Sequence, residues 1–341
     1  MPLYQAFIPT RYSQPLIQLL ARSEEKFVEQ IQSDTGLNLE QLCSPDSILT
    51  IDEFDTLFLA LHRLTGRTDL GFELGESITL ASHGLLGHAA AHCRTIGEVL
   101  SLGVRFARLM SPSFTLVYRT GKNHGELIWR PAAGMSTFTL HAFYEIHVVS
   151  LYRLLEALMG SRLPVFDGWL PIPKPPHARR FSRLPKLRVH FSAGDLPEVR
   201  TTIPDAVSLF PLRLEDTNTL PSLDELQNMQ RSFTQTRQWR TWVELMLREC
   251  ENCQPTQAEL ADLINVSAHT LARRLREEGC SFRELSGTIR HQRALEMLSQ
   301  GRYSIEQIAG RLGYEQVSNF SHAFSKIEGI SPRTAKDALH R

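Results

Sequence analysis

The spacing of apolar residues changes along the chain near residue 210. Before that point, runs with helical spacing mix with runs that alternate apolar and polar residues, as strands do. The segment FTLVYRTGKNHGELIWRP alternates in this way and predicts a β-hairpin around GKNHG. Thr50 and Glu53 have the spacing of a capping box that begins a helix, and apolar residues follow at every third or fourth position: Phe54, Leu57, Phe58, Leu61 and Leu64. From about Gln238 onward only helical spacing occurs, so the sequence predicts an α+β domain followed by an all-α domain.

Further elements are expected in the first part of the chain. Thr95 and Glu98 form a second capping pair, SHGLLGHAAAHC predicts a shorter helix, and LRVHF predicts a short strand. A long apolar helix is expected from about residue 136 to 159. A polar region with Pro211 and Pro221 then reads as a linker. The expected boundaries are 1–210 for the α+β effector-binding or dimerisation domain, 211–236 for the linker and 237–341 for the all-α domain.

An internal repeat lies in the all-α part. Ala261 lies four residues before Asn265, and Ala309 lies four residues before Gly313. Two helices that cross steeply need a small side chain where they touch and a residue that tolerates positive φ at the turn. This spacing therefore predicts two helix-turn-helix units. The residues expected to face inward are Leu260, Ala261, Ile264, Leu271 and Leu275 in the first unit and Ile308, Ala309, Leu312, Phe320 and Phe324 in the second.

The second helix of each predicted unit has an outer face that is free to enter a DNA major groove. Between the units, SFRELSGTIRHQRALEMLSQ predicts a helix about 30 Å long at 1.5 Å per residue. One turn of B-DNA is about 34 Å, so this helix can hold two recognition helices in successive major grooves. Ser304 and Gln307 predict a capping box at the start of the second unit. The outer-face residues are Ala268, His269, Ala272, Arg273 and Arg276, then Val317, Ser318, Ser321, His322 and Lys326.

Composition narrows the class of protein. The chain has 341 residues, of which 42% are hydrophobic and 22% charged, which excludes a collagenous or wholly disordered protein. It has no apolar run long enough for a membrane span and no secretory signal, so a cytoplasmic location is expected. Five scattered cysteines argue against a disulfide framework, and the Cys250–Cys253 pair lacks nearby partners for a zinc site.

The distribution of charged residues predicts that DNA is attracted by a local basic patch and not by the net charge of the whole chain. The chain carries 37 basic and 37 acidic residues, so its formal net charge is zero. Twelve basic and eight acidic residues lie from Asn265 to Arg341, and Glu277 and Glu278 are expected to face away from the DNA backbone. A basic run from Trp169 to Phe191 can bind polyanions, but a solvated surface loop is the favoured interpretation.

Two histidine clusters raise the alternative of metal binding. His88 and His92 lie four residues apart on an expected helix, but they lack the glutamate of a zinc-protease helix. His141, Glu145 and His147 form a similar cluster, of which only the first two share a helix face. Ordinary packing or polar roles are favoured for both clusters, and no metal or other cofactor is predicted.

The second unit resembles the AraC/XylS family of bacterial transcription regulators. The segments IAGRLGY, NFSHAFSKIEG and ISPRTAK carry this resemblance, and VSAHTLARRLREEGCSFREL with IRHQRALEML extends it into the first unit. In the first domain, LTGRTDLGFELGESITLASHGLLGHAAAHCRTIGEVLSL is similar to the arabinose-binding-type domain of the family's OruR-like branch. The resemblance implies promoter DNA and RNA polymerase as partners, an unidentified small-molecule effector and a possible homodimer. An arginine or ornithine effector would need a pair of carboxylates in a pocket, and the effector-binding residues stay unassigned.

The resemblance also implies which side chains meet DNA. His322 stands where the family usually has arginine, so contacts there are expected to be weaker or dependent on pH. Ala335 stands where an aromatic residue is common. Arg276 and Lys326 are expected to contact phosphates. The base contacts carried over by position are His269, Ala272, Arg273, Val317, Ser318, Ser321 and His322.

These features together predict a sequence-specific DNA-binding transcriptional regulator. The chain has no P-loop, GxSxG or GxGxxG motif, and it lacks the zinc-bound cysteine cluster of the DNA-repair alkyltransferases that share this helix-turn-helix. It is therefore not expected to be an enzyme. The alternative is an interaction or adaptor protein whose helix-turn-helix repeats bind protein instead of DNA.

Overall fold

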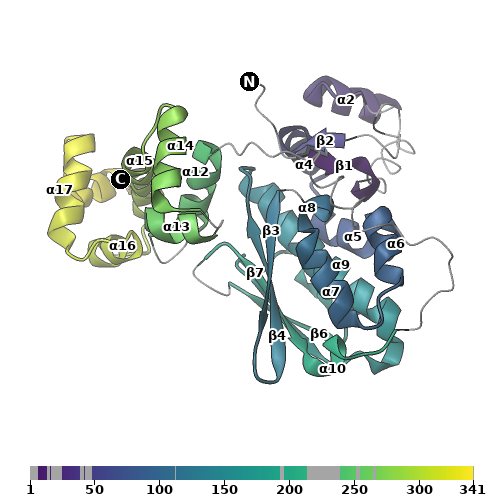
Figure 1. Cartoon of the computed structure of the whole chain (residues 1–341). Coiled ribbons are helices and arrows are strands. Elements are labelled where there is room, and N and C mark those ends of the chain that lie inside the picture. The colour runs from purple at the N-terminus through teal and green to yellow at the C-terminus, as the bar shows by residue number, and fades with distance from the viewer. Residues whose placement is uncertain are drawn as a thin grey trace. The chain divides into compact units, whose positions relative to one another are not determined.

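The computed structural model divides into two compact units, Met1–Gly194 with Glu198–Gln238, and Asp195–Pro197 with Trp239–Arg341 (Figure 1). The structure describes residues 7–13, 16, 25–38, 42, 48–111, 113–192, 196–212, 239–250, 254–263 and 266–340. The first unit combines a mixed sheet with helices and the second is helical, so the predicted fold class is confirmed. Most of the expected linker, together with Cys253, Ile264 and Asn265, lies outside the described residues.

Five strands form the main sheet of the described part of the first unit, in the order β3-β4-β7-β5-β6. The predicted hairpin is present as β3 and β4, and LRVHF forms β6. All neighbouring strands are antiparallel except β5 and β6, which pair in parallel. The strands span Phe114–Thr120 (β3), His124–Pro131 (β4), Phe166–Leu170 (β5), Leu187–Phe191 (β6) and Val199–Pro204 (β7).

The sequence did not predict β5, β7 or the small sheet in which β1 (Phe7–Pro9) pairs with β2 (Ile48–Thr50). β5 was not predicted because it lies in a proline-rich region. β7 buries Val199, Thr201 and Ile203 on alternate positions, so a threonine takes one of the inward places of the strand.

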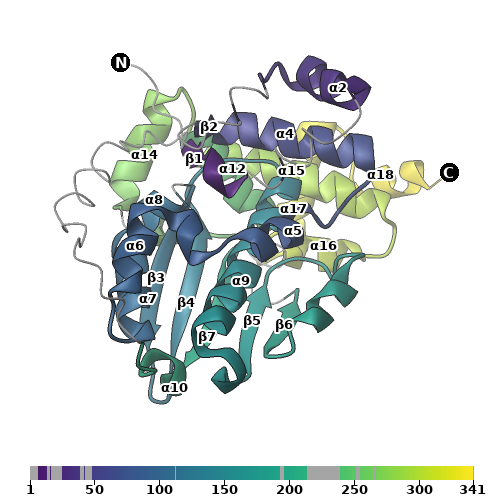
Figure 2. The same ribbon diagram turned by 90° about the vertical axis from the view of Figure 1, so that its right-hand side faces the viewer.

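Helices α7 (Ile96–Arg105) and α9 (Thr137–Met159) lie against one face of the sheet (Figures 1 and 2). α9 is the predicted long apolar helix, and its sides are buried along much of its length. α5 (Leu70–Ser77) packs closely on α9. The approach is so close that a Cβ added at Gly75 would lie only 2.7 Å from the Cβ of Val149. A Cβ at Gly71 would overlap the carbonyl oxygen of Ala142. These two glycines, one helical turn apart, therefore allow the close contact of the two helices.

α4 (Ile51–Thr65) begins at the predicted Thr50–Glu53 capping box and buries Phe54, Leu57, Phe58 and Leu61. The expectation that Leu64 joins this face is wrong, since Leu64 lies in the last turn and is 37% exposed. The remaining helices of this unit are η1 (Thr10–Tyr12), α2 (Glu25–Thr35), η2 (Leu80–His83), α6 (Leu85–Ala91), α8 (Ala107–Met110), η3 (Gly160–Arg162), η4 (Ala178–Arg183) and α10 (Asp205–Ser208).

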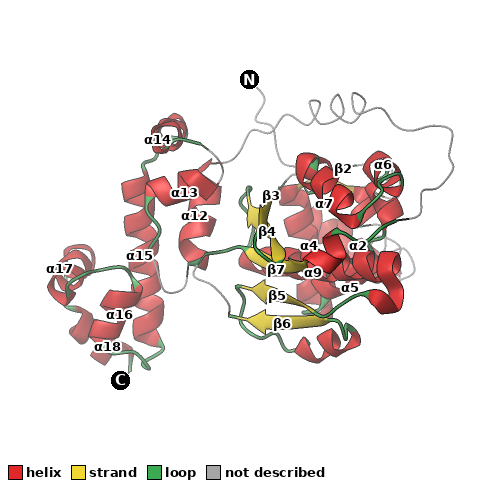
Figure 3. Cartoon of the chain, turned by 60° about the horizontal axis from the view of Figure 1, so that its bottom comes forward, coloured by secondary structure: helices red, strands yellow, loops and turns green. Residues whose placement is uncertain are grey.

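The second unit has two hydrophobic cores that share helix α15 (Figure 3). The first half of α15 gives Leu285 and Ile289 to one core, and the second half gives Ala294 and Leu298 to the other. The helices of this unit are α12 (Trp239–Glu249), α13 (Gln257–Leu263), α14 (Ala268–Glu277), α15 (Phe282–Ser299), α16 (Ile305–Arg311), α17 (Val317–Glu328) and α18 (Pro332–Leu339). Across the described ranges of both units, no helix combines the length and the apolar character needed to span a membrane.

Candidate nucleic-acid interface and internal cavity

Helix α14 is stabilised by the packing of its inner face in the core and by a side-chain hydrogen bond at its N-terminus. The backbone N–H of Thr270 donates to the Ser267 hydroxyl at 3.1 Å, which satisfies a free donor in the first turn. Leu271 and Leu275 are fully buried, as the repeat predicts. Ala261 on α13 is also fully buried, so the first helix-turn-helix unit has its small residue inside the core.

The second unit repeats this arrangement with α16 and α17. The capping box of Ser304 and Gln307 begins α16. Gly313 has φ +75°, which places the predicted turn residue in the left-handed region that favours glycine. Phe320 and Phe324 are each 2% exposed and pack in the same core as Ala309. Both units therefore keep one face of their second helix for the core and leave the other outside.

Most of the side chains expected to meet DNA lie on these outer faces. In α14, His269, Arg273 and Arg276 are exposed, and Ala272 beside them is half-buried. In α17 the exposed residues are Ser318, His322 and Lys326, and Ser321 is half-buried. Val317 of α17 and Ala268 of α14 were expected on the outer faces, but each is partly buried and packs against the core of its own unit. Ala335, by contrast, is 6% exposed and belongs to the second core.

The acidic residues at the end of α14 behave differently from one another. Glu278 accepts hydrogen bonds from the backbone N–H groups of Trp239 and Arg240 at 3.0 and 2.7 Å, so its carboxylate caps α12. Glu277, which is expected to face away from the DNA backbone, forms ion pairs within α14. Its carboxylate lies 3.3 Å from Arg273 and 2.9 Å from Arg274, because residues three and four positions apart share a helix face.

Helix α15 sets the distance between the two units. Its 18 residues span about 27 Å at 1.5 Å per residue. His291 on α15 lies 2.7 Å from Glu328 at the end of α17, and the guanidinium of Arg290 lies over the Tyr314 ring. Figure 3 shows α14 and α17 near opposite ends of α15, both viewed nearly end-on. The two candidate recognition helices are thus joined by a helix that contributes residues to both cores.

The basic run from Trp169 to Phe191 contributes to the fold of the first unit. Arg180 forms ion pairs with Asp69, Glu73 and Glu76, and its side chain is 19% exposed. Burial raises the pKa of Asp69, but hydrogen bonds from Arg67 and Arg180 outweigh this effect and hold that pKa below its ordinary value. Arg180 is therefore occupied by carboxylates of its own domain.

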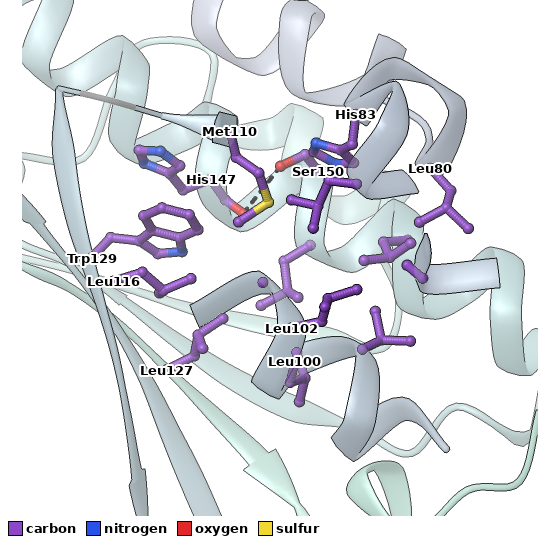
Figure 4. A pocket seen from close by; sticks show the side chains of 16 residues that line it. Leu80, His83, Leu100, Leu102, Met110, Leu116, Leu127, Trp129, His147 and Ser150 are labelled. Atoms are coloured by element: carbon purple, nitrogen blue, oxygen red, sulfur yellow. Dashed lines mark hydrogen bonds between the residues drawn. The ribbon is translucent and has the colours of Figure 1, made fainter. Parts of the chain in front are cut away.

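The first unit contains a cavity, partly open to solvent, that is bordered by α6, α7, α9, β3 and β4 (Figure 4). Two adjoining lobes have volumes of about 90 and 80 Å³. Most of the side chains around them are leucines and other apolar residues. The lobes share His83, Met110, Trp129, His147 and Ser150.

Polar groups of the cavity are few and uncharged. The rings of Trp129 and His147 stack with centroids 4.2 Å apart, and burial lowers the pKa of His147 to about 3. Burial, aided by the charge of Arg11, lowers the pKa of His83 to about 4. The Nδ1 atom of His83 lies 2.8 Å from the Tyr12 hydroxyl. Both histidines are therefore neutral at pH 7. No sequence pattern predicts this cavity, because its walls come from segments that lie far apart in the chain.

The residues of the two histidine clusters serve packing and hydrogen bonding. The rings of His88 and His92 lie with centroids 5.1 Å apart, and the two residues are also linked by a 2.9 Å contact from His92 Nδ1 to the His88 carbonyl. Glu145 accepts hydrogen bonds from the Phe72 backbone at 3.1 Å and contacts His177 at 2.8 Å. Within the described residues, no group of three or more His, Cys, Asp and Glu side chains is placed to hold a metal ion.

Comparison with known families matches both units. Residues 28–195 match the arabinose-binding domain of AraC transcription regulators, and residues 260–338 match a helix-turn-helix domain. An uncharacterized HTH-type transcriptional regulator of Mycobacterium tuberculosis, Rv1395, is 27% identical over 89% of this chain and 88% of its own. The ornithine utilization regulator of Pseudomonas aeruginosa is 24% identical over 97% of this chain and 96% of its own.

Among solved structures, the transcriptional regulator CdpR from Pseudomonas aeruginosa is similar over 92% of this chain and 97% of its own. The sequence identity is 20% and the TM-score is 0.43. The C-terminal domain of AraT from Geobacillus stearothermophilus is 29% identical over 31% of this chain and 88% of its own, with a TM-score of 0.28.

Proposed function

Because the chain belongs to the AraC/XylS family of transcription regulators, we propose that its helices α14 and α17 read bases in successive major grooves of promoter DNA. One observation carries this proposal. Two helices with buried inner faces and exposed outer faces are joined by an 18-residue helix that packs in both cores. Its length of about 27 Å is close to the ~34 Å repeat of B-DNA.

The side chains divide into base-reading and phosphate-binding groups. Arg276 and Lys326 are exposed cations on the outer faces and are proposed to contact phosphates. Arg273 is proposed to read a guanine, because its guanidinium can donate two hydrogen bonds to that base. The full set of proposed base contacts is His269, Ala272, Arg273, Val317, Ser318, Ser321 and His322.

We further propose that a small molecule bound to the first unit controls promoter occupancy. The effector would bind one arrangement of the protein more tightly than another and so shift the balance between them. Homodimer formation and contact with RNA polymerase belong to the same proposal. Support comes from the match of the first unit to a ligand-binding domain of this family.

Selection of bound fragments from genomic DNA tests the DNA-binding proposal. The purified full-length chain is expected to enrich a small set of fragments that share one motif. The Arg273→Ala variant is the informative comparison, and Arg274→Ala on the same helix is its matched control. Enrichment of a motif by wild type and Arg274→Ala, and its loss or change with Arg273→Ala, supports the proposal. Failure of the folded wild-type chain to enrich any motif would favour the adaptor alternative.

A further inference from the structure

We infer that the internal cavity of the first unit binds a small, uncharged and mostly apolar molecule that carries one hydroxyl group. This inference rests on the proposed effector control and names the chemical class of the effector.

The walls of the cavity exclude charged ligands. Among the described side chains that line the two lobes, none is Asp, Glu, Lys or Arg. An ion placed there would lose its hydration without gaining a partner of opposite charge. Arginine or ornithine would need carboxylates that these walls do not provide, and a sugar would bury several hydroxyl groups against leucine side chains. The lining therefore favours an uncharged molecule with a mainly apolar body.

The wall shared by the two lobes offers hydrogen bonds to a polar group. The indole Nε1 of Trp129 and the Nδ1 of His147 are buried and have no hydrogen-bond partner among the described residues. The two residues are 8% and 6% exposed. Figure 4, which draws the side chains around the first lobe, shows the two rings together on the side of that lobe away from Leu80, with Met110 between. A hydroxyl group can accept a hydrogen bond from the indole N–H, and it can also donate one to an imidazole nitrogen, so either atom can bind a hydroxyl group.

The size of the cavity limits the ligand further. The lobes of about 90 and 80 Å³ adjoin each other and share Ser150 in their walls. An apolar cavity of about 150 Å³ is enough to hold a benzene molecule. A single six-membered ring with one hydroxyl group therefore fits the space without a large rearrangement. Cyclohexanol is the simplest probe with these properties.

Binding is measured with the full-length chain by calorimetric titration and by thermal unfolding. The probes are cyclohexanol, cyclohexanecarboxylate and L-ornithine. Cyclohexanol is expected to bind saturably and to raise the unfolding temperature, whereas the carboxylate binds at least ten-fold more weakly and ornithine does not bind. Tighter binding of either charged probe than of cyclohexanol would overturn the inference.

A cavity-filling variant locates the site. Ser150→Leu places a larger side chain between the lobes and is expected to weaken cyclohexanol binding at least ten-fold. Ser101→Leu makes the same change at an exposed position of α7 and is expected to leave binding unchanged. Ala90→Val adds a smaller volume to the first lobe, and this variant replaces Ser150→Leu in the experiment if Ser150→Leu does not fold. Equal binding by wild type and the folded filling variant, or no saturable binding by wild type, would overturn the inference.

The two proposals can fail separately. Cyclohexanol binding is measured without DNA, and fragment selection is performed without any small molecule. If cyclohexanol does not bind but fragment selection succeeds, the assigned cavity ligand is overturned and the DNA-binding proposal stands. If fragment selection fails but cyclohexanol binds, the DNA-binding proposal is overturned and the cavity site stands.

Discussion

Arg273 is the residue on which sequence discrimination by α14 is expected to depend most. Its guanidinium lies 3.3 Å from the Glu277 carboxylate, and its side chain is 50% exposed. An exposed pair of this kind contributes little to stability, so Arg273 can leave Glu277 and meet a base. The family resemblance supplies the expected role, and the structure shows that the side chain is accessible.

Replacing Arg273 with alanine is expected to cost on the order of 1–3 kcal/mol of binding free energy at the cognate site, because a bidentate contact to guanine is lost. Binding to unrelated DNA should change much less. Titrations of both DNA types with Arg273→Ala and the control Arg274→Ala measure the difference. An equal loss on all sequences would make Arg273 a phosphate contact.

Gly313 is expected to be essential for folding of the second helix-turn-helix unit. Its φ is +75°, and an added Cβ would lie 2.8 Å from the Cβ of Gln254. Gly313→Val should therefore destabilise the C-terminal unit by about 2 kcal/mol or more, since a β-branched residue resists positive φ. Gly310→Val on α16 is the matched control, because an added Cβ there meets nothing within 4 Å. Denaturant unfolding that gives equal stability for the two variants would contradict this role of Gly313.

At the scale of elements, α9 and η2 bring two neutral histidines into the cavity wall. The pKa is lowered to about 3 for His147 and to about 4 for His83, against an ordinary value of 6.5. Between pH 6.5 and these lower values, the unfolded chain binds more protons than the folded chain does. The free energy of unfolding of the first unit should therefore fall as the pH falls below 6.5, by about 1.4 kcal/mol per pH unit for each histidine.

Denaturant unfolding of the first unit at pH 7 and pH 5 measures this dependence. His147→Phe keeps an aromatic ring against Trp129 and is expected to reduce the loss between the two pH values. His124→Phe changes an exposed histidine of the hairpin and is expected to leave the loss unchanged. A pH dependence that stays the same in His147→Phe would show that His147 titrates normally in the folded protein.

Elements defined by nearby residues were predictable from the sequence. The capping boxes at Thr50 and Ser304 join residues three positions apart, and both are present. The small residues Ala261 and Ala309 are buried where the repeat places them. Such signals are visible in the sequence because the partners are close together along the chain.

Features that depend on distant residues were not predictable in the same way. β7 lies between β4 and β5 only because the sheet joins segments far apart in the chain. The cavity likewise combines Ile8 and Tyr12 with residues of α7, α9 and the hairpin. Leu64 has the correct helical spacing, but α4 ends before any neighbour covers that turn. The candidate DNA contacts could be named from the repeat and the resemblance, and they await direct tests.

At the scale of the whole molecule, the second unit carries two separate helix faces that we propose to read DNA bases. The shared helix α15 fixes their spacing because it belongs to both cores. The formal net charge of the chain is zero, so attraction to DNA must come from local cations such as Arg276 and Lys326. We therefore expect binding that is sequence-specific and weakens as salt concentration rises.

Hydroxyl-radical footprinting of the full-length protein on a selected genomic fragment tests the central claim most directly. If α14 and α17 occupy successive major grooves, each bound chain should protect two short stretches on one face of the duplex, about 10 base pairs apart. Each stretch should lose protection when the outer face of its own helix is altered, by Arg273→Ala for one and His322→Ala for the other. A single protected stretch, or two stretches on opposite faces of the duplex, would contradict the account.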